Sequence, residues 1–263
     1  MKTKLKKSTL FLLSLVSVTF FGFIIGHTRT FASETISKDD LNKRIHFLYK
    51  LKALQKYPGA VLDTLDKALP DGVRITGLVL NKEKISLQGY ALNNNRIAEY
   101  INNLKGEKIF NNIEFDRSTR IKKKGQHIFK FSLTILPGEI IVDEIKGQKQ
   151  QDLRSLLSGL ENLLLEKIEI AKILNEVQFM LIDSNLETKK IAPTSTKSNE
   201  LYPGYTLIIQ ADGNYSNLNL LFDKVSKMDT IAAVDELKIK PLSRASKNTT
   251  LSATFKITMY IKK

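Results

Sequence analysis

The feature that most constrains the fold is an internal repeat. Residues 85–135 and 209–259 align without a gap at a constant spacing of 124 residues, as from Ile85 to Ile209. The apolar positions coincide along the whole length, for example at Gly89 and Gly213, Ile97 and Leu221, Leu104 and Met228, Phe110 and Val234, Phe131 and Phe255, and Leu133 and Ile257. A repeat of this length predicts two similar small domains, because solenoid repeats run about 20–50 residues. We expect Gly89 and Gly213 to occupy equivalent places just before the second helix of each unit.

Composition supports two domains and removes several kinds of chemistry. The chain has 263 residues, of which 42% are apolar, enough for two compact domains of about 100 residues each. It has no Cys, which excludes disulfides, thiolate metal sites and cysteine nucleophiles. The net charge is +14, and the five basic residues and no acid of segment 1–33 leave +9 for the remainder. Such a surface suits anionic lipid, cell-wall polymer or nucleic acid, and charge alone does not choose among them.

The N-terminus predicts export. The basic segment Met1–Lys7 precedes Thr9–Gly26, an uncharged apolar run of 18 residues. At about 1.5 Å per residue this run nearly spans the ~30 Å hydrocarbon core as an anchoring helix. It also resembles a signal peptide, with a cleavage site at Thr30–Ala32. Both interpretations carry the following residues across the cytoplasmic membrane. We therefore expect a single-pass inner-membrane protein with its bulk in the periplasm, or a soluble periplasmic protein cleaved near Ala32.

The first half of the exported part predicts the order αββαββ. A helix starts at Ser37–Asp40, carries an apolar stripe from Leu41 to Leu54, is interrupted at Tyr57–Gly59 and restarts over 60–69. Alternating apolar residues then predict strands, with a helix between the two hairpins. The expected ranges are strands 73–80 and 85–89, helix 96–104, and strands 110–121 and 126–136.

The second half predicts a long helix followed by the second copy. Apolar residues spaced near 3.5 indicate one helix over 148–184 of the coiled-coil type. A first strand near 186–191 precedes a turn at Pro193 and a Ser/Thr/Lys-rich loop. The remaining elements are expected at 205–211, 217–228, 234–240 and 251–261.

These elements predict an α+β fold with two ferredoxin-like (αββαββ) domains in tandem, each preceded by a stalk or coiled-coil-type helix. The predicted division is 1–33, membrane anchor or signal peptide; 34–137, stalk helix plus first domain; 138–185, linker and long helix; and 186–263, second domain.

A search for catalytic motifs is negative. The sequence has no nucleophile elbow, phosphate-binding loop, zinc-protease helix or dinucleotide fingerprint. The adjacent acids Asp39–Asp40, Asp143–Glu144 and Asp235–Glu236 are interpreted as solvated charge, since neighbours on a strand point to opposite faces. His27, His46 and His127 have no partner at ligand spacing. We predict no enzyme, no catalytic, cofactor-binding or metal-binding residues, and no cofactor.

The most concentrated charge is a basic hairpin tip formed by Arg117, Arg120, Lys122, Lys123 and Lys124. It suits contact with anionic lipid or cell-wall polymer, or it is a solvated turn that discourages edge pairing. The RNA-binding strand motif is absent and the chain is predicted to be exported, so nucleic acid is not an expected partner.

Two segments resemble known families. Lys56–Leu65, Leu69–Thr76 (L-P-D-G-V-R-I-T) and Ile85–Ala91 (I-S-L-Q-G-Y-A) resemble the PilN family of type IV pilus assembly. Leu207–Tyr215 (L-I-I-Q-A-D-G-N-Y) and Leu221–Ser226 resemble the PilO family. The resemblance covers about residues 41–136 and 150–261, in that order.

The resemblance implies a non-enzymatic inner-membrane scaffold of type IV pilus assembly, or of a related type II secretion or competence system. The implied partners are other inner-membrane pilus or secretion proteins, prepilin subunits and a secretin-associated lipoprotein, with a homo- or heterodimer expected. PilN-like proteins dock a cytoplasmic partner through an I-N-L-L-P-type peptide, which Met1–Ser8 lack. The alternative is an exported, signal-cleaved binding module that uses a basic face on an anionic cell-envelope polymer.

Overall fold

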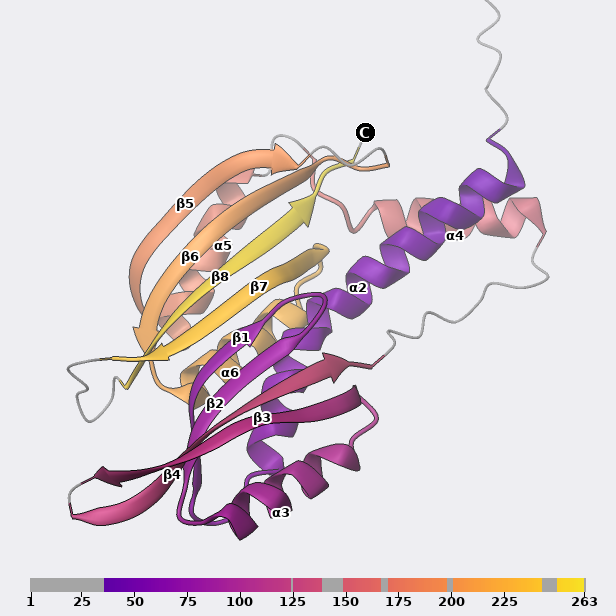
Figure 1. Ribbon diagram of the computed structural model, residues 1–263. Helices are drawn as coiled ribbons and strands as arrows, with labels where there is room; N and C mark the ends of the chain where they lie inside the picture. The colour runs from indigo at the N-terminus through magenta and orange to yellow at the C-terminus, as the bar shows by residue number, and fades with distance from the viewer. Residues whose placement is uncertain are drawn as a thin grey trace, which may run out of the picture. The chain divides into compact units, whose positions relative to one another are not determined.

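A computed structural model describes residues 36–123, 125–138, 149–166, 170–197, 201–242 and 250–262. This part of the chain holds five helices and eight strands (Figure 1). The helices are α2 (Lys38–Lys67), α3 (Asn94–Lys105), α4 (Gln150–Glu161), α5 (Ile170–Asp183) and α6 (Tyr215–Ser226). The strands are β1 (Val73–Leu80), β2 (Ile85–Ala91), β3 (Phe110–Lys123), β4 (Gln126–Pro137), β5 (Glu187–Lys197), β6 (Gly204–Gly213), β7 (Ala232–Pro241) and β8 (Leu251–Tyr260).

All eight strands form one antiparallel sheet in the order β3-β4-β2-β1-β7-β8-β6-β5. The N half, which runs from α2 to β4, supplies β3-β4-β2-β1. The C half, which runs from α4 to β8, supplies β7-β8-β6-β5 in the matching order. The predicted α+β class is confirmed. The division into tandem ferredoxin-like domains stays a prediction, because the pairing of β1 with β7 merges both halves within one compact unit, Lys38–Lys263.

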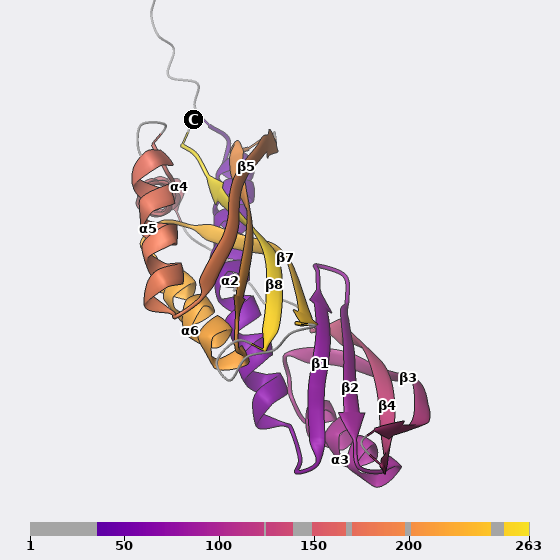
Figure 2. The same ribbon diagram turned by 90° about the vertical axis from the view of Figure 1, so that its left-hand side faces the viewer.

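Helices α2, α3, α5 and α6 pack on one face of the sheet (Figure 2). The alternation along the strands explains this, because one set of side chains from each strand faces the helices. In β2 these are Ile85, Leu87 and Ala91, all buried, whereas Gln88 on the other face is exposed. The core therefore lies between one layer of helices and one sheet.

The pairing of the strands shows that the spacing between equivalent residues of the two halves differs from the spacing in the sequence alignment. Gly89 of β2 lies opposite Phe131 of β4, whereas Gly213 of β6 lies opposite Leu251 of β8. The pair that corresponds to Gly89 and Phe131 is Ala211 and Ala253, which stands 122 residues further along on both strands. The predicted equivalence of Gly89 and Gly213 is therefore wrong by two residues.

Periodicity explains this error. The helix N-caps of the two halves, Asn93 and Asn214, stand 121 residues apart, three fewer than the aligned spacing. A shift of two residues leaves a strand pattern unchanged, and a shift of three nearly preserves a helical one. Apolar patterns alone therefore identify the repeat without determining its register.

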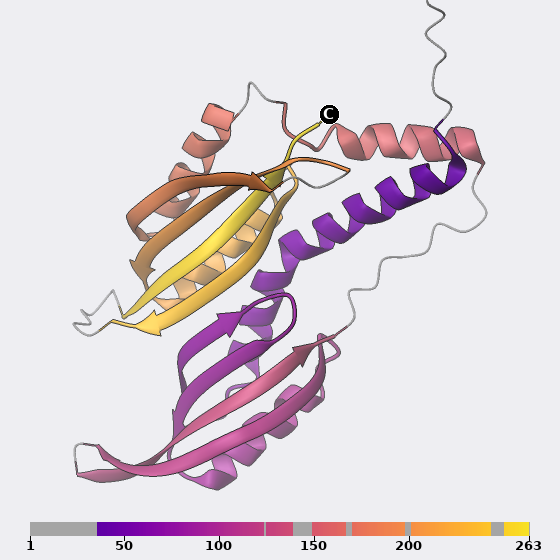
Figure 3. The ribbon, with the colours of Figure 1, turned by 45° about the horizontal axis from the view of Figure 1, so that its top comes forward.

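Helix α2 is continuous, so the predicted interruption at Tyr57–Gly59 is wrong. Pro58 lies inside the helix and is buried. Proline costs a helix interior about 3 kcal/mol, and packing on both sides of this residue offsets that cost. Leu51, Val61 and Leu62 are all buried along the same helix. Figure 3 shows α2 as one helix whose N-terminal part lies beside α4.

The predicted single helix over 148–184 is also wrong, because α4 and α5 are separate helices. Leu165, which lies between these helices, pairs with the chain at the end of β8. The Leu165 N–H donates to the Tyr260 carbonyl at 2.9 Å, and the Lys262 N–H donates to the Leu165 carbonyl at 2.8 Å. Leu164 and Leu165 are buried there. These contacts with the end of β8 give the Leu165 backbone its hydrogen-bond partners and bury the side chains of Leu164 and Leu165. They therefore replace the hydrogen bonds and packing that a continued helix would have.

Pro193 lies within β5 rather than in the predicted turn. It fits because β5 is an edge strand, the place where a sheet tolerates a residue without an N–H. The predicted anchor or signal, Thr9–Gly26, lies outside the described residues. None of the helices that the structure describes is both long and apolar enough to cross a membrane.

Candidate functional site

The polar residues singled out from the sequence do not gather into a site. Asp40 pairs with Arg44 at 3.1 Å on the first turns of α2, where His46 is exposed. His127 lies near the tip of the β3–β4 hairpin, opposite Lys122. His27, Asp143–Glu144 and Lys124 lie outside the described residues. In the described ranges no three metal-ligating side chains come together.

The basic hairpin tip lies on β3, an edge strand. Arg117, Arg120, Lys122 and Lys123 are all exposed. The Lys123 Nζ lies 4.6 Å from the centre of the Tyr90 ring, a cation–π contact. The use of this tip stays a prediction.

The best-developed polar and apolar contacts lie where the two halves meet, a region that we call the joint. The joint consists of the pairing between β1 and β7 and the packing of α2 against α6 and β7. Strand pairing is short: Leu78 lies opposite Ile239 and Leu80 opposite Leu237, with all four side chains buried. The halves therefore share backbone hydrogen bonding as well as a core.

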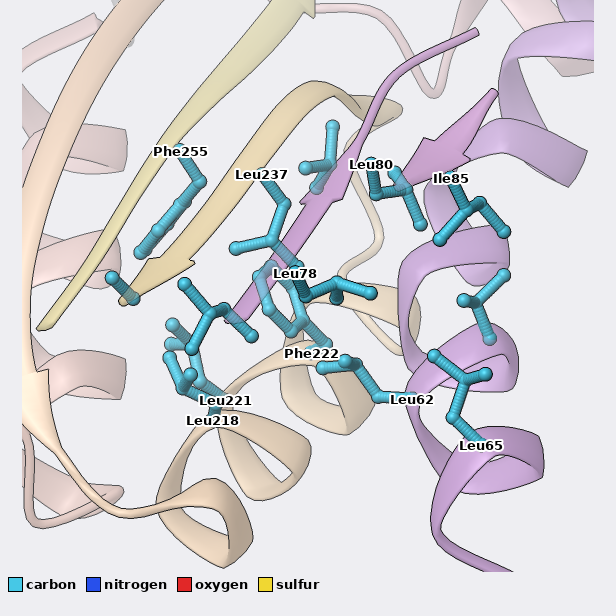
Figure 4. Close-up of a cluster of buried hydrophobic side chains, with 14 of the residues drawn as sticks. Leu62, Leu65, Leu78, Leu80, Ile85, Leu218, Leu221, Phe222, Leu237 and Phe255 are labelled. Atoms are coloured by element: carbon cyan, nitrogen blue, oxygen red, sulfur yellow. The ribbon is translucent and has the colours of Figure 1, made fainter. Parts of the chain in front are cut away.

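Side chains from both halves form that shared core (Figure 4). Leu62 and Leu65 from α2 pack in one buried cluster with residues of α6, β7 and β8. The contributors from the C half include Leu218, Leu221, Phe222, Leu237 and Phe255. Phe222 and Phe255 stack edge to face, with ring centroids 5.4 Å apart. The two halves therefore share one hydrophobic core.

Gln55 is the polar centre of the helix side of the joint. Its side chain extends from α2 and is 3% exposed. The Nε2 group donates to the Val225 carbonyl at 2.7 Å and lies 3.3 Å from the carbonyls of Met228 and Thr230. Val225 lies in the last turn of α6, where its carbonyl also accepts the Met228 N–H at 3.3 Å, and Met228 and Thr230 follow that turn. Gln55 thus caps a helix of the other half.

A second side-chain bond ties α6 to α2. The Tyr215 hydroxyl, at the start of α6, donates to the Leu62 carbonyl at 2.7 Å. Burial raises the pKa of Tyr215 above its usual range, with smaller contributions from Asp66 and Asp63. The two helices also touch at Gly59, where a Cβ would lie 3.6 Å from the Phe222 Cβ, an ordinary van der Waals distance.

An ion pair closes the sheet side of the joint. Lys82, in the turn between β1 and β2, lies 2.7 Å from the Asp235 Oδ1 in β7. The Asp235 side chain is 7% exposed and Lys82 is 55% exposed. The Thr258 hydroxyl donates to the other Asp235 oxygen, and Thr206 lies 3.0 Å from Thr258. The interpretation of Asp235 as solvated charge is therefore wrong, because a bulge in β7 at this residue turns it inward.

Glu236, the neighbour of Asp235, does face solvent. It lies 2.7 Å from both Lys238 and Lys256 on the open face of the sheet. Hydrogen bonds from Lys238 and then Lys256 lower the pKa of Glu236 to about 2.

Sequence reasoning missed Gln55 although a signal existed. Gln55 occupies a position on the apolar stripe of α2, four residues after Leu51 and seven before Leu62. A polar residue on such a stripe is buried with the stripe and needs a partner. Asp235 had no comparable signal, because the bulge depends on strand pairing. The joint therefore connects the two halves by strand pairing, a shared core, the Gln55 hydrogen bonds and the Lys82–Asp235 ion pair.

Comparison with known families finds one match in each half. Residues 60–136 match the family model of fimbrial assembly protein (PilN). Residues 169–262 match the model of the type IVa pilus alignment subcomplex PilO C-terminal domain. A comparison with curated proteins gives no match.

Among solved structures, the crystal structure of the type 4 fimbrial biogenesis protein PilO from Pseudomonas aeruginosa is similar to part of the chain. It is 18% identical over 45% of this chain and 92% of its own, with a TM-score of 0.36. A likeness of this size adds nothing to the two family matches, which confirm the predicted resemblance. A segment similar to the PilN family is therefore followed, in a single polypeptide, by a segment similar to the PilO C-terminal domain.

Proposed function

We propose that this protein is a non-enzymatic scaffold of type IV pilus assembly, or of a related type II secretion or competence system, in which PilN-like and PilO-like segments pair within one chain. The observation that carries the proposal is the joint itself. Its two halves share a strand pairing, a buried core, and two buried polar groups, Gln55 and Asp235, that find partners across it. Fusion makes such pairing intramolecular, so no association entropy opposes it.

The proposed location follows from the N-terminal segment. Thr9–Gly26 would anchor the chain in the inner membrane and leave the described residues in the periplasm, or a signal would be removed near Ala32. We keep the predicted division at 33, 137 and 185 as part of this proposal. The proposed partners are other inner-membrane pilus or secretion proteins, prepilins and a secretin-associated lipoprotein.

Complementation of a deletion strain tests the proposal. The strain would receive the parent chain, the double variant Gln55→Met and Asp235→Ala, or the control Lys56→Met, whose side chain is exposed on α2. We expect the parent and the control to restore pilus assembly, secretion or DNA uptake and the joint variant to fail at equal protein level. The proposal is wrong if deletion leaves all three processes intact.

Crosslinking in cells would identify the assembly or secretion system in which the protein acts. A C-terminally tagged chain expressed at its native level would be crosslinked, and its membrane and periplasmic fractions analysed by mass spectrometry. Recovery from the membrane with prepilins or a polytopic assembly protein supports the scaffold. Recovery as a soluble species without such partners contradicts it and favours the exported binding module.

A further inference from the structure

The two free edges of the sheet differ in their capacity to accept another strand. One edge is β5, which contains Pro193. The other is β3, a strand of 14 residues with no proline. Bulges between Phe110 and Asn112 and between Phe115 and Arg117 interrupt β3, and Arg117–Lys123 then continue without a further shift. Strands average about 5–6 residues, so this part of β3 alone offers a full strand for pairing. No other strand among the described residues pairs with the outer side of β3, and an unpaired edge is a template for another chain.

Repetition of the β1–β7 pairing between two molecules is blocked. Leu80 of β1 lies opposite Ile85, and the equivalent residue of β5 is Pro193, which lies opposite Leu207, 122 residues beyond Ile85. In β1, Leu80 pairs with Leu237 of β7. Pro193, at the equivalent position of β5, has no backbone N–H to donate to a neighbouring strand. A second copy therefore cannot add to β5 as β7 adds to β1, and head-to-tail growth of the sheet is prevented.

The charges of β3 favour a different arrangement. Its first part carries Glu114 and Asp116, and its last part carries Arg117, Arg120 and Lys122. All five side chains are exposed, and within the described residues none of them makes an ion pair. Antiparallel pairing of two such strands about Ser118 brings the acidic part of each, which precedes the bulge between Phe115 and Arg117, near the basic part of the other. Parallel pairing would set like charges together, which is unfavourable.

We propose that β3 pairs antiparallel with β3 of a second copy of this chain, about a two-fold axis near Ser118. A two-fold contact of one patch with itself closes after two copies, so the sheet continues across the dimer and stops at β5 on both sides. The pairing would also cover Phe115, a large apolar side chain that is 51% exposed on this edge. This inference goes beyond the proposed function and does not depend on it.

Single cysteines provide a direct test, because the chain has none of its own. The full chain in detergent solution would carry Ser118→Cys or Thr119→Cys near the proposed axis, or the control Thr188→Cys on the exposed edge of β5. We expect oxidation with copper phenanthroline to give disulfide-linked dimers from the two β3 variants and only background from the control. Equal crosslinking of all three variants, or none from either β3 variant, would overturn the proposal.

A charge exchange separates specific pairing from chance collision. On the Thr119→Cys background, one chain carries Glu114→Lys and Asp116→Lys, and another carries Arg120→Glu and Lys122→Glu. Each alone should fall to the level of the β5 control, because its two β3 strands now repel. A mixture of the two should crosslink again, as a heterodimer.

Circular dichroism would check that both variants stay folded. Failure of the mixture to crosslink overturns the proposal. So does undiminished crosslinking of the Glu114→Lys and Asp116→Lys chain alone, or retention on heparin that depends on Arg120 and Lys122 without any dimer, which would assign the edge to an anionic polymer.

Discussion

At the residue scale, Gln55 is the side chain with the most demanding environment. Replacement by Met keeps its length but removes the donor to the Val225, Met228 and Thr230 carbonyls, and the Val225 carbonyl keeps its bond from the Met228 N–H. The net loss of one such hydrogen bond costs about 0.5–1.5 kcal/mol. We expect Gln55→Met to lower the free energy of unfolding by that amount in urea titrations. Lys56→Met, one position along on the exposed side of α2, should change it by less than about 0.5 kcal/mol.

Lys82 and Asp235 should be energetically coupled across the joint. Asp235→Ala loses the ion pair and the bond from Thr258, whereas Lys82→Ala loses only the ion pair. We therefore expect the larger loss for Asp235→Ala. A double-mutant cycle in urea should give a coupling energy of about 1 kcal/mol, since Lys82 is partly solvated. Strict additivity of the two substitutions would show that the ion pair does not contribute.

Glu236 should make stability depend on pH in the acid range. Its pKa falls from 4.5 to about 2 on folding, because Lys238 and Lys256 hydrogen-bond the carboxylate. The stabilisation is therefore present above about pH 4.5 and is lost as the pH falls toward 2. We expect Glu236→Gln to be less stable than the parent by up to about 1 kcal/mol at pH 7. The difference should vanish near pH 2, and a constant offset from pH 7 to pH 2 would contradict this cause.

At the scale of elements, two glycines should respond in opposite directions. A Cβ on Gly89 in β2 would lie 2.7 Å from a Phe131 ring carbon and 2.8 Å from the Arg74 carbonyl oxygen. Gly89→Ala should therefore destabilise by about 1–3 kcal/mol. Gly159, on the exposed side of α4, has nothing within 4 Å of such a Cβ. Gly159→Ala should stabilise by about 0.5–1 kcal/mol. Thermal unfolding of the pair of variants checks both signs.

At the scale of the whole molecule, the joint should hold the two halves together without a continuous chain. A protease site placed between Gly138 and Lys149 would allow cleavage of the folded protein. We expect the fragments to co-elute in size-exclusion chromatography, because the β1–β7 pairing, Gln55 and the Lys82–Asp235 pair all cross the joint. The cleaved Gln55→Met and Asp235→Ala double variant should dissociate more readily. Separation of the parent fragments after cleavage would show that the linker, rather than the joint, keeps the halves together.

Much of the fold could be predicted from the sequence because it is encoded locally. Alternation predicted both strands of the β3–β4 hairpin, and the expected ranges 96–104 and 217–228 correspond to α3 and α6. The order αββαββ and the resemblance to two families followed from the same short-range patterns. Of the two polar residues that the joint buries, Gln55 and Asp235, only Gln55 left a trace in the sequence, as a polar interruption of an apolar stripe.

The sequence by itself determined which elements form, which face of each is buried, and that the two halves are related. Only the tertiary structure decided that β1 pairs with β7, that α2 continues through Pro58, that the chain leaves the helix between α4 and α5, and that Asp235 is buried. The reason is physical. Periodicity records which side of an element avoids water, whereas the choice of strand edges, breaks and bulges depends on contacts between residues far apart in the chain.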